Sequence, residues 1–156
     1  MIIIFIFMCV VYRLPGFAAS IALCIYTGIV LVALNAFDIT LTLPGIAGII
    51  LGIGMAVDAN VIIFARVKEE LAAGRNVRTA LKTGFQKALS AILDGNVTTL
   101  IAAIVLGMMG SGSVKGFAQT LALGIVVSMF TALVVTRIII FSLYAVGCKS
   151  EKMYGT

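Results

Sequence analysis

The sequence predicts an all-α integral membrane protein, folded as a polytopic helical bundle. Of its 156 residues, 62% are hydrophobic and only 11% are charged, and the mean hydropathy is +1.23. A soluble domain of this size needs a polar shell, which so few polar residues cannot build. Long apolar runs also recur along the whole chain between short polar links, as expected for consecutive membrane-spanning helices.

Five apolar stretches are the candidate spans, because a helix needs about 20 apolar residues to cross the hydrocarbon. They are residues 2–12, 17–36, 43–65, 89–109 and 117–146. The first is shorter than a full span, and we expect it to be truncated. Pro15 and Gly16 follow it and favour a tight turn. The predicted membrane domain therefore covers residues 1–148, and residues 149–156 form a cytoplasmic tail.

The segment 76–88 is amphipathic and precedes the fourth span. Apolar residues recur along it at helical spacing, while Arg78, Lys82, Gln86 and Lys87 occupy the other face. This pattern predicts a helix on the inner membrane surface that turns into the fourth span.

Charge alternates from one link to the next and predicts the orientation. The chain has eleven Lys and Arg against six acids, a formal charge of +5. The first and third links and the tail are basic, whereas the second link holds only Asp38 and the fourth only Lys115. Basic links stay in the cytoplasm, so we expect the N-terminus of this chain outside and the C-terminus in the cytoplasm. Such a start without a leader predicts a piece of a longer protein.

Several kinds of chemistry have no support in the sequence. There is no histidine, and the three cysteines (Cys9, Cys24 and Cys148) have no metal-site or disulfide spacing. No GxxxxGK[ST] nucleotide-binding loop is present. We therefore expect no catalytic residues, no metal, no cofactor and no nucleic-acid partner.

Asp58 interrupts the third span and is the first candidate functional residue. It follows Leu43 by about 22 Å of helix, which places it inside the hydrocarbon. A charge there costs several kcal/mol, and intramembrane acids often form proton relays. We expect neighbouring helices to hold Asp58 away from water while it loads and unloads a proton. The alternative is a protonated side chain that only joins helices by hydrogen bonds.

Small residues form predicted packing faces in two spans. In the third span, Gly48 and Gly52 make a GxxxG pair within a stripe of small residues, Gly45, Gly48, Gly52, Ala56 and Ala59. The last span carries a ladder at every fourth position, Gly116, Thr120, Gly124, Ser128, Ala132 and Thr136. Such faces let helices approach closely, so the third span belongs inside a bundle. Arg137 follows the ladder as a positive-inside anchor.

A second acidic motif repeats the first. "LDGN" at 93–96 has the form of "VDAN" at 57–60, an Asp and an Asn separated by one small residue. Asp94 is therefore a second proton-relay candidate at comparable depth, or alternatively a helix cap at the interface. Asn60, Asn96 and Thr98 are candidate supporting polar residues.

Three stretches closely resemble the C-terminal membrane region of the SecD family, accessory subunits of the bacterial Sec translocase and relatives of the RND transporters. They are "LTLPGIAGIILGIGMAVDANVIIFARVKEEL", "DGNVTTLIAAIVL" and "GSGSVKGFAQTLALGIVVSMFTALVVTR". The resemblance implies the second to sixth helices of a six-helix unit in the bacterial plasma membrane. The family's first helix and large outer domain are missing. It also implies that Asp58 is the family's proton-pathway aspartate.

The resemblance further implies partners and an activity. The partners would be SecF, the SecYEG channel, the SecA motor, membrane lipids and, through the missing outer domain, the exported unfolded polypeptide. The activity would couple proton-motive force to late stages of protein translocation. Ala65 and Gly95 depart from residues common in the family, Glu and Ala. Two other functions stay open: an RND-type exporter of lipids or small molecules, and a structural assembly subunit.

Overall fold

The computed structural model describes residues 2–146 and is helical throughout, apart from short links. The helices are α1 (Ile2–Ala36), α2 (Leu43–Ala72), α3 (Val77–Met109), α4 (Ser113–Phe130) and α5 (Arg137–Val146), with a π-helical segment η1 (Thr131–Thr136) joining the last two. No strand occurs between residues 2 and 146. The predicted all-α membrane bundle is confirmed. The predicted tail, 149–156, lies outside the described residues.

Helix α1 consists of two parts that meet at a sharp bend. Arg13 has φ 50° and ψ −116°, and the chain folds back so closely that a Cβ on Gly16 would overlap the carbonyl oxygen of Met8. The part before the bend, Ile2–Arg13, is about 18 Å long, too short to cross a bilayer core of about 30 Å.

Four other helical stretches are long and apolar enough to span a membrane: Pro15–Ala36, Leu43–Ala72, Val77–Met109 and Ser113–Ser142. They correspond to the second to fifth predicted spans. The first predicted span, 2–12, forms a helix of the expected short length.

The amphipathic segment 76–88 is helical and leads into the fourth span, as predicted, but its apolar face does not lie against the membrane surface. It forms the first turns of α3, which continues to Met109 without interruption. Its apolar residues are buried against α2 instead of the membrane surface; a Cβ on Gly84 would come within 2.8 Å of the backbone of Val67. The physical reason is that α2 extends to Ala72 and offers a protein surface to this face.

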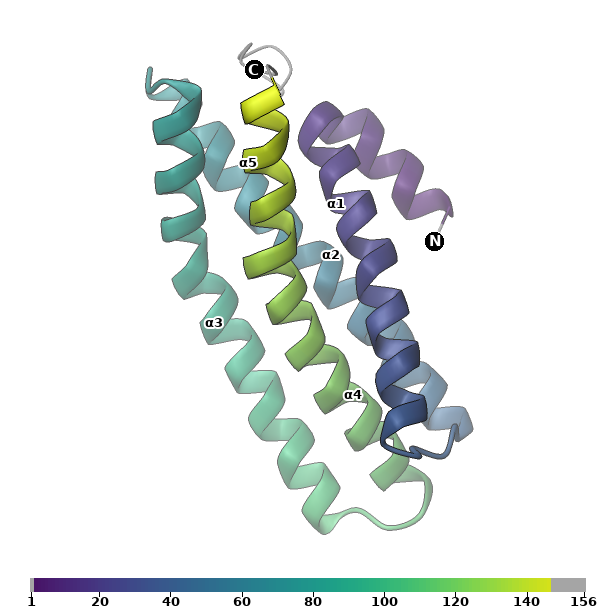
Figure 1. Ribbon diagram of the computed structural model, residues 1–156. Coiled ribbons are helices and arrows are strands. Elements are labelled where there is room, and N and C mark those ends of the chain that lie inside the picture. Colours follow the sequence, from purple (N-terminus) through teal and green to yellow (C-terminus); the bar gives the residue numbers. More distant parts are fainter. Residues whose placement is uncertain (1, 147–156) are drawn as a thin grey trace.

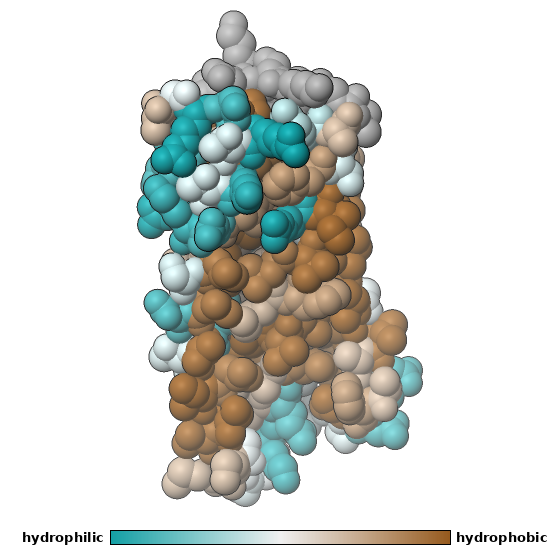
Figure 2. Space-filling view, turned by 60° about the vertical axis from the view of Figure 1, so that its left-hand side comes forward, coloured by the Kyte–Doolittle hydropathy of each residue, from teal (hydrophilic) through white to brown (hydrophobic). Residues whose placement is uncertain are grey.

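The helices run up and down in one bundle (Figure 1). The links α1–α2 and α3–α4 lie at its lower end, and the link α2–α3 lies at its upper end. Capping fixes where two helices begin: Gly45 N donates to Thr42 Oγ1 over 3.1 Å at α2, and Thr79 N donates to Asn76 Oδ1 over 2.9 Å at α3. Figure 2 shows a broad apolar band between a hydrophilic upper cap and smaller polar groups at the lower end.

Candidate functional site

Close packing of α2 against α4 sets the position of the acidic motif on α2. The small residues of the α2 stripe are all buried, and so are Gly116, Thr120, Gly124 and Ser128 of the ladder. A Cβ on Gly48 would lie 3.1 Å from the Phe117 carbonyl oxygen, and one on Gly52 would lie 3.5 Å from Gly124 Cα. The two backbones therefore meet with no room for larger side chains.

The Asp and Asn of each acidic motif have opposite environments. Asn60 is 3% exposed and Asn96 is 8% exposed, whereas Asp58 and Asp94 are both exposed on the surface of residues 2–146. Two positions along a helix turn through about 200°, so a buried Asn requires its Asp to point outward. The shared motif form therefore places both acids on outward faces.

Asn60 joins α2 to the last span. Its Oδ1 accepts a 2.8 Å hydrogen bond from Thr136 Oγ1, and its Nδ2 donates to the Ala56 carbonyl oxygen over 3.1 Å. Thr136 is fully buried and ends the π-helical segment η1. Such π-helical turns are often found at functional sites, and this one ends at the residue that bonds Asn60.

The second motif makes only local hydrogen bonds. Asn96 Nδ2 donates to the Ile92 carbonyl oxygen over 2.8 Å, and Thr98 Oγ1 donates to the Asp94 carbonyl oxygen over 2.8 Å. Thr98 is exposed like Asp94. Neither side chain hydrogen-bonds another helix within residues 2–146; Asp94 and Thr98 form the exposed polar face of this motif, and Asn96 is buried.

A groove between α2 and α3 brings Asp58 of the first motif near Asn96 of the second, whereas Asp94, Asn60 and Thr98 do not line it. It encloses about 190 Å³ and is lined by Met55, Asp58, Ala59, Ile62, Ala91, Ile92, Gly95, Asn96 and Thr99. The helical rise from the start of α2 to Asp58 is about 22 Å, and the rise from Asp94 to the end of α3 is also about 22 Å. The start of α2 and the end of α3 both lie at the lower end of the bundle, so the two acids are at a similar height above it. An acid, an amide and a hydroxyl thus share one groove at the depth of the hydrocarbon.

The expectation that neighbouring helices shield Asp58 is not met within residues 2–146. Its side chain is exposed, because α2 turns its small-residue face to α4 and its Asn60 face to η1. The remaining face carries Asp58 and borders the groove that α2 forms with α3, which leaves the side chain open on one side. A carboxylate that faces hydrocarbon unpaired is costly, so Asp58 would need a proton, a counterion or water at this position.

Sequence reasoning missed two buried polar residues. Glu70 is 4% exposed; Lys87 Nζ donates to its Oε1 over 2.5 Å, and Arg75 Nε lies 3.0 Å from its Oε2. Tyr26 is fully buried, and a Cβ on Gly52 would lie 2.6 Å from its hydroxyl. The one sequence signal for Glu70 was an acid among basic residues at the end of an apolar helix.

The charges of Glu70, Lys87 and Arg75 hold the upper end of the bundle together. Their pairing ties the end of α2 to α3 and to the link between them. Among residues 2–146, no group of three or more His, Cys, Asp or Glu side chains is placed to hold a metal ion.

Comparison with protein families gives one match that covers almost the whole chain. Residues 1–146 match the family described as protein export membrane protein SecD/SecF, C-terminal. A relative from Acidaminococcus fermentans, named protein translocase subunit SecD, is 56% identical over 140 residues, covering 90% of this chain and 34% of that protein. A relative of the same name from Dictyoglomus turgidum is 49% identical over 156 residues, covering 99% of this chain and 39% of that protein. The chain thus spans less than half the length of these relatives.

Solved structures give the same fold. The crystal structure of SecDF, a translocon-associated membrane protein from Thermus thermophilus, matches with a TM-score of 0.90 at 41% identity, covering 94% of this chain and 20% of that one. A second crystal structure, of SecDF in a super-membrane-facing form, matches with the same score, identity and coverage.

Proposed function

The chain belongs to the SecD/SecF family of protein export membrane proteins, and we propose that it is a membrane subunit of the bacterial Sec export machinery that couples proton-motive force to late steps of protein translocation. It acts without enzymatic chemistry, in the plasma membrane, together with SecF, the SecYEG channel and the SecA motor. Its relatives named protein translocase subunit SecD support this assignment.

The observation that carries the coupling role is the position of Asp58. It is an acid at the depth of the hydrocarbon, beside the groove between α2 and α3, with no counterion among residues 2–146. Moving one proton's charge through 100 mV yields about 2.3 kcal/mol. Asp58 is the proposed site where a proton is bound and released, and Asp94 on the adjacent helix is the second relay position.

Asn60, Asn96 and Thr98 have the proposed role of positioning residues. The bond from Thr136 to Asn60 fixes the rotation of α2 about its axis, which directs Asp58 away from α4. A matching half, proposed to be SecF, would cover the face that carries Asp58. A protein export subunit of this kind reaches its polypeptide substrate through parts of the protein outside this chain.

The test is Asp58→Asn in the complete export machinery. We expect protein export driven by proton-motive force and the associated proton conductance to fall at least about tenfold, because an amide cannot release a proton. The control is Asp38→Asn, which removes an exposed acid from the α1–α2 link. Normal export and conductance in Asp58→Asn at equal protein level would leave only a structural assembly role.

Co-purification separates the remaining alternative. Isolation of the protein with SecF and SecYEG supports the export function. Isolation without either, combined with proton-driven efflux of a lipid or small molecule, would assign it to RND-type export instead.

A further inference from the structure

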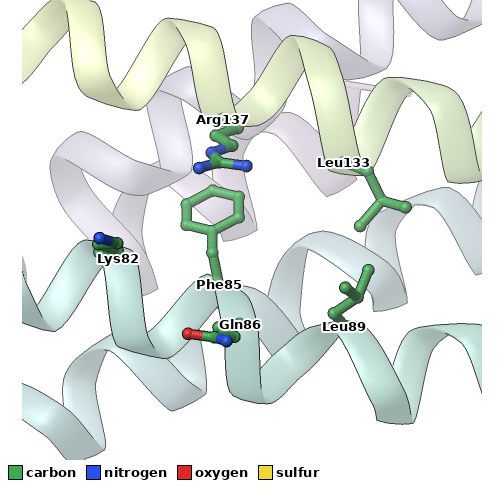
Figure 3. A pocket seen from close by; sticks show the side chains of 6 residues that line it. All are labelled: Lys82, Phe85, Gln86, Leu89, Leu133 and Arg137. Atoms are coloured by element: carbon green, nitrogen blue, oxygen red, sulfur yellow. The ribbon is translucent and has the colours of Figure 1, made fainter.

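A cavity at the upper end of the bundle lies between α3 and the last span. It encloses about 350 Å³ and is lined by Lys82, Phe85, Gln86, Leu89, Leu133 and Arg137. Figure 3 shows Arg137 reaching from α5 toward Phe85 of α3. Two cations, an amide and three apolar side chains therefore line one cavity that the coupling function does not use.

Lys82 and Arg137 have no ion pair within residues 2–146, in contrast to Lys87, Arg75 and Arg66. Lys87 and Arg75 are neutralised by Glu70, and Arg66 pairs with Glu69 at 2.7 Å. Within residues 2–146, no carboxylate lies within ion-pair distance of Lys82 or Arg137. The Arg137 guanidinium instead lies 5.8 Å from the centre of the Phe141 ring, a cation–π contact that restrains it while leaving its donors available.

The depth of the cavity matches the boundary between lipid tails and headgroups. The helical rise from Leu89 to the end of α3 is about 30 Å, and the rise from the start of α4 to Arg137 is about 36 Å. The hydrocarbon itself is about 30 Å thick. Leu89 and Leu133 are therefore at the level of the tails, whereas Lys82, Gln86 and Arg137 are at the level of the headgroups.

We propose that this cavity binds the phosphodiester headgroup of an anionic phospholipid from the adjacent leaflet. Lys82 and Arg137 neutralise the phosphate from two different helices, and the Gln86 amide donates to one of its oxygens. Phe85, Leu89 and Leu133 contact the glycerol backbone and the first methylenes of the acyl chains. Those apolar side chains favour a lipid over free phosphate, which has no part that would gain from contacting them. Basic pockets between spanning helices are a known mode of headgroup recognition.

The test measures lipid binding by native mass spectrometry of the intact protein in detergent, titrated with phosphatidylglycerol and, separately, with phosphatidylcholine. In the double variant Lys82→Gln/Arg137→Gln, we expect phosphatidylglycerol affinity to fall roughly 30-fold, since each basic residue near a headgroup contributes about 1 kcal/mol. The affinity of this double variant for phosphatidylcholine should stay within about threefold of that of the parent protein, because the choline cation of that headgroup already balances its phosphate.

Two matched variants make the result specific. Arg66→Gln/Lys68→Gln removes the same charge from exposed positions on α2 that do not line the cavity, and we expect affinity within about threefold of the parent protein. Lys82→Arg/Arg137→Lys keeps both charges and should retain binding, which separates loss of charge from loss of fold.

Equal losses in the cavity variant and the α2 variant would overturn the proposal, because binding would then depend on overall charge. Displacement of phosphatidylglycerol by millimolar inorganic phosphate, with retention in chloride at equal ionic strength, would also overturn it in favour of a free-phosphate site.

Discussion

At the scale of single residues, the contact that Asn60 makes decides which face of α2 is buried and which face is exposed. Asn60 and Asp58 are two residues apart, yet Asn60 is 3% exposed and bonded to Thr136, while Asp58 is exposed. A side-chain amide whose oxygen and nitrogen are both hydrogen-bonded tolerates burial between helices, whereas a buried carboxylate needs a cation, a proton or water. The Asn60–Thr136 bond therefore orients the acid without touching it.

The first prediction concerns this bond. Thr136→Val keeps the shape of the side chain but removes the donor and leaves Asn60 Oδ1 unpaired. We expect a double-mutant cycle with Asn60→Leu to give a coupling energy of about 0.6 kcal/mol, and at most about 1.7 kcal/mol, as for other hydrogen bonds between membrane helices. The measurement is unfolding of each variant in mixed micelles with increasing dodecyl sulfate.

Thr27→Val is the matched control. The Thr27 hydroxyl donates to the Leu23 carbonyl oxygen of its own helix, so it should show no coupling to Asn60→Leu. Fully additive effects of Asn60→Leu and Thr136→Val would mean that the bond contributes nothing to holding α2 in place.

At the scale of helices, the packing of α2 on α4 follows from small residues whose pattern is visible in the sequence. The stripe through Gly48 and Gly52 and the ladder through Thr120 and Gly124 lie on one buried interface. Residues about four positions apart lie on the same face of a helix. A single sequence therefore suffices to find the contact face of each of the two helices.

Other parts of the site could not be found in this way, because they depend on pairs of residues from different helices. Glu70 and Lys87 are 17 residues apart, and Thr136 is 76 residues from Asn60. Tyr26 fills the space beside Gly52 and Gly124, yet its own helix shows only an ordinary apolar pattern. Hydropathy locates the spans, but it does not say which of them meet, nor that segment 76–88 packs on α2.

The second prediction compares two glycines of α2. In Gly48→Ala the new methyl group would overlap Thr120 and crowd the Phe117 carbonyl oxygen, so we expect the free energy of unfolding to fall by about 1–3 kcal/mol. Gly54→Ala places the same methyl group where nothing lies within 4 Å. We expect this variant to be unchanged or more stable by up to about 1 kcal/mol, from its better helix propensity.

Both variants are measured by the same dodecyl sulfate unfolding assay. Equal stability of Gly48→Ala and Gly54→Ala would contradict the close approach of α2 and α4. A loss in both variants would instead indicate that the alanines disturb the helix itself.

At the scale of the whole molecule, charge and hydropathy together define an axis. The upper end (Figures 1 and 2) is where α2 ends and α3 begins, with Arg75 in the link and Arg78 in the first turn of α3, whereas Asp38 and Lys115 belong to the links and helix starts of the lower end. Basic links are retained in the cytoplasm, so the upper end is the expected cytoplasmic end. In this orientation the cavity proposed to bind lipid would lie in the inner leaflet, and the proposed proton path from outside to Asp58 would cross more than half of the membrane.

The last prediction tests this orientation with single cysteines in cells. After replacement of Cys9, Cys24 and Cys148 by serine, Lys115→Cys and Arg78→Cys each introduce one thiol at an exposed position at opposite ends. A membrane-impermeant maleimide should label Lys115→Cys in intact spheroplasts, and it should label Arg78→Cys only after the membrane is permeabilised. Labelling of both in denatured samples shows that each thiol is reactive. The reverse labelling pattern would mean that the upper end of the bundle faces outward. The Glu70 ion pairs and the cavity proposed to bind lipid would then lie at the outer surface. The six basic residues from Arg66 to Lys87 would also lie there, against the positive-inside rule.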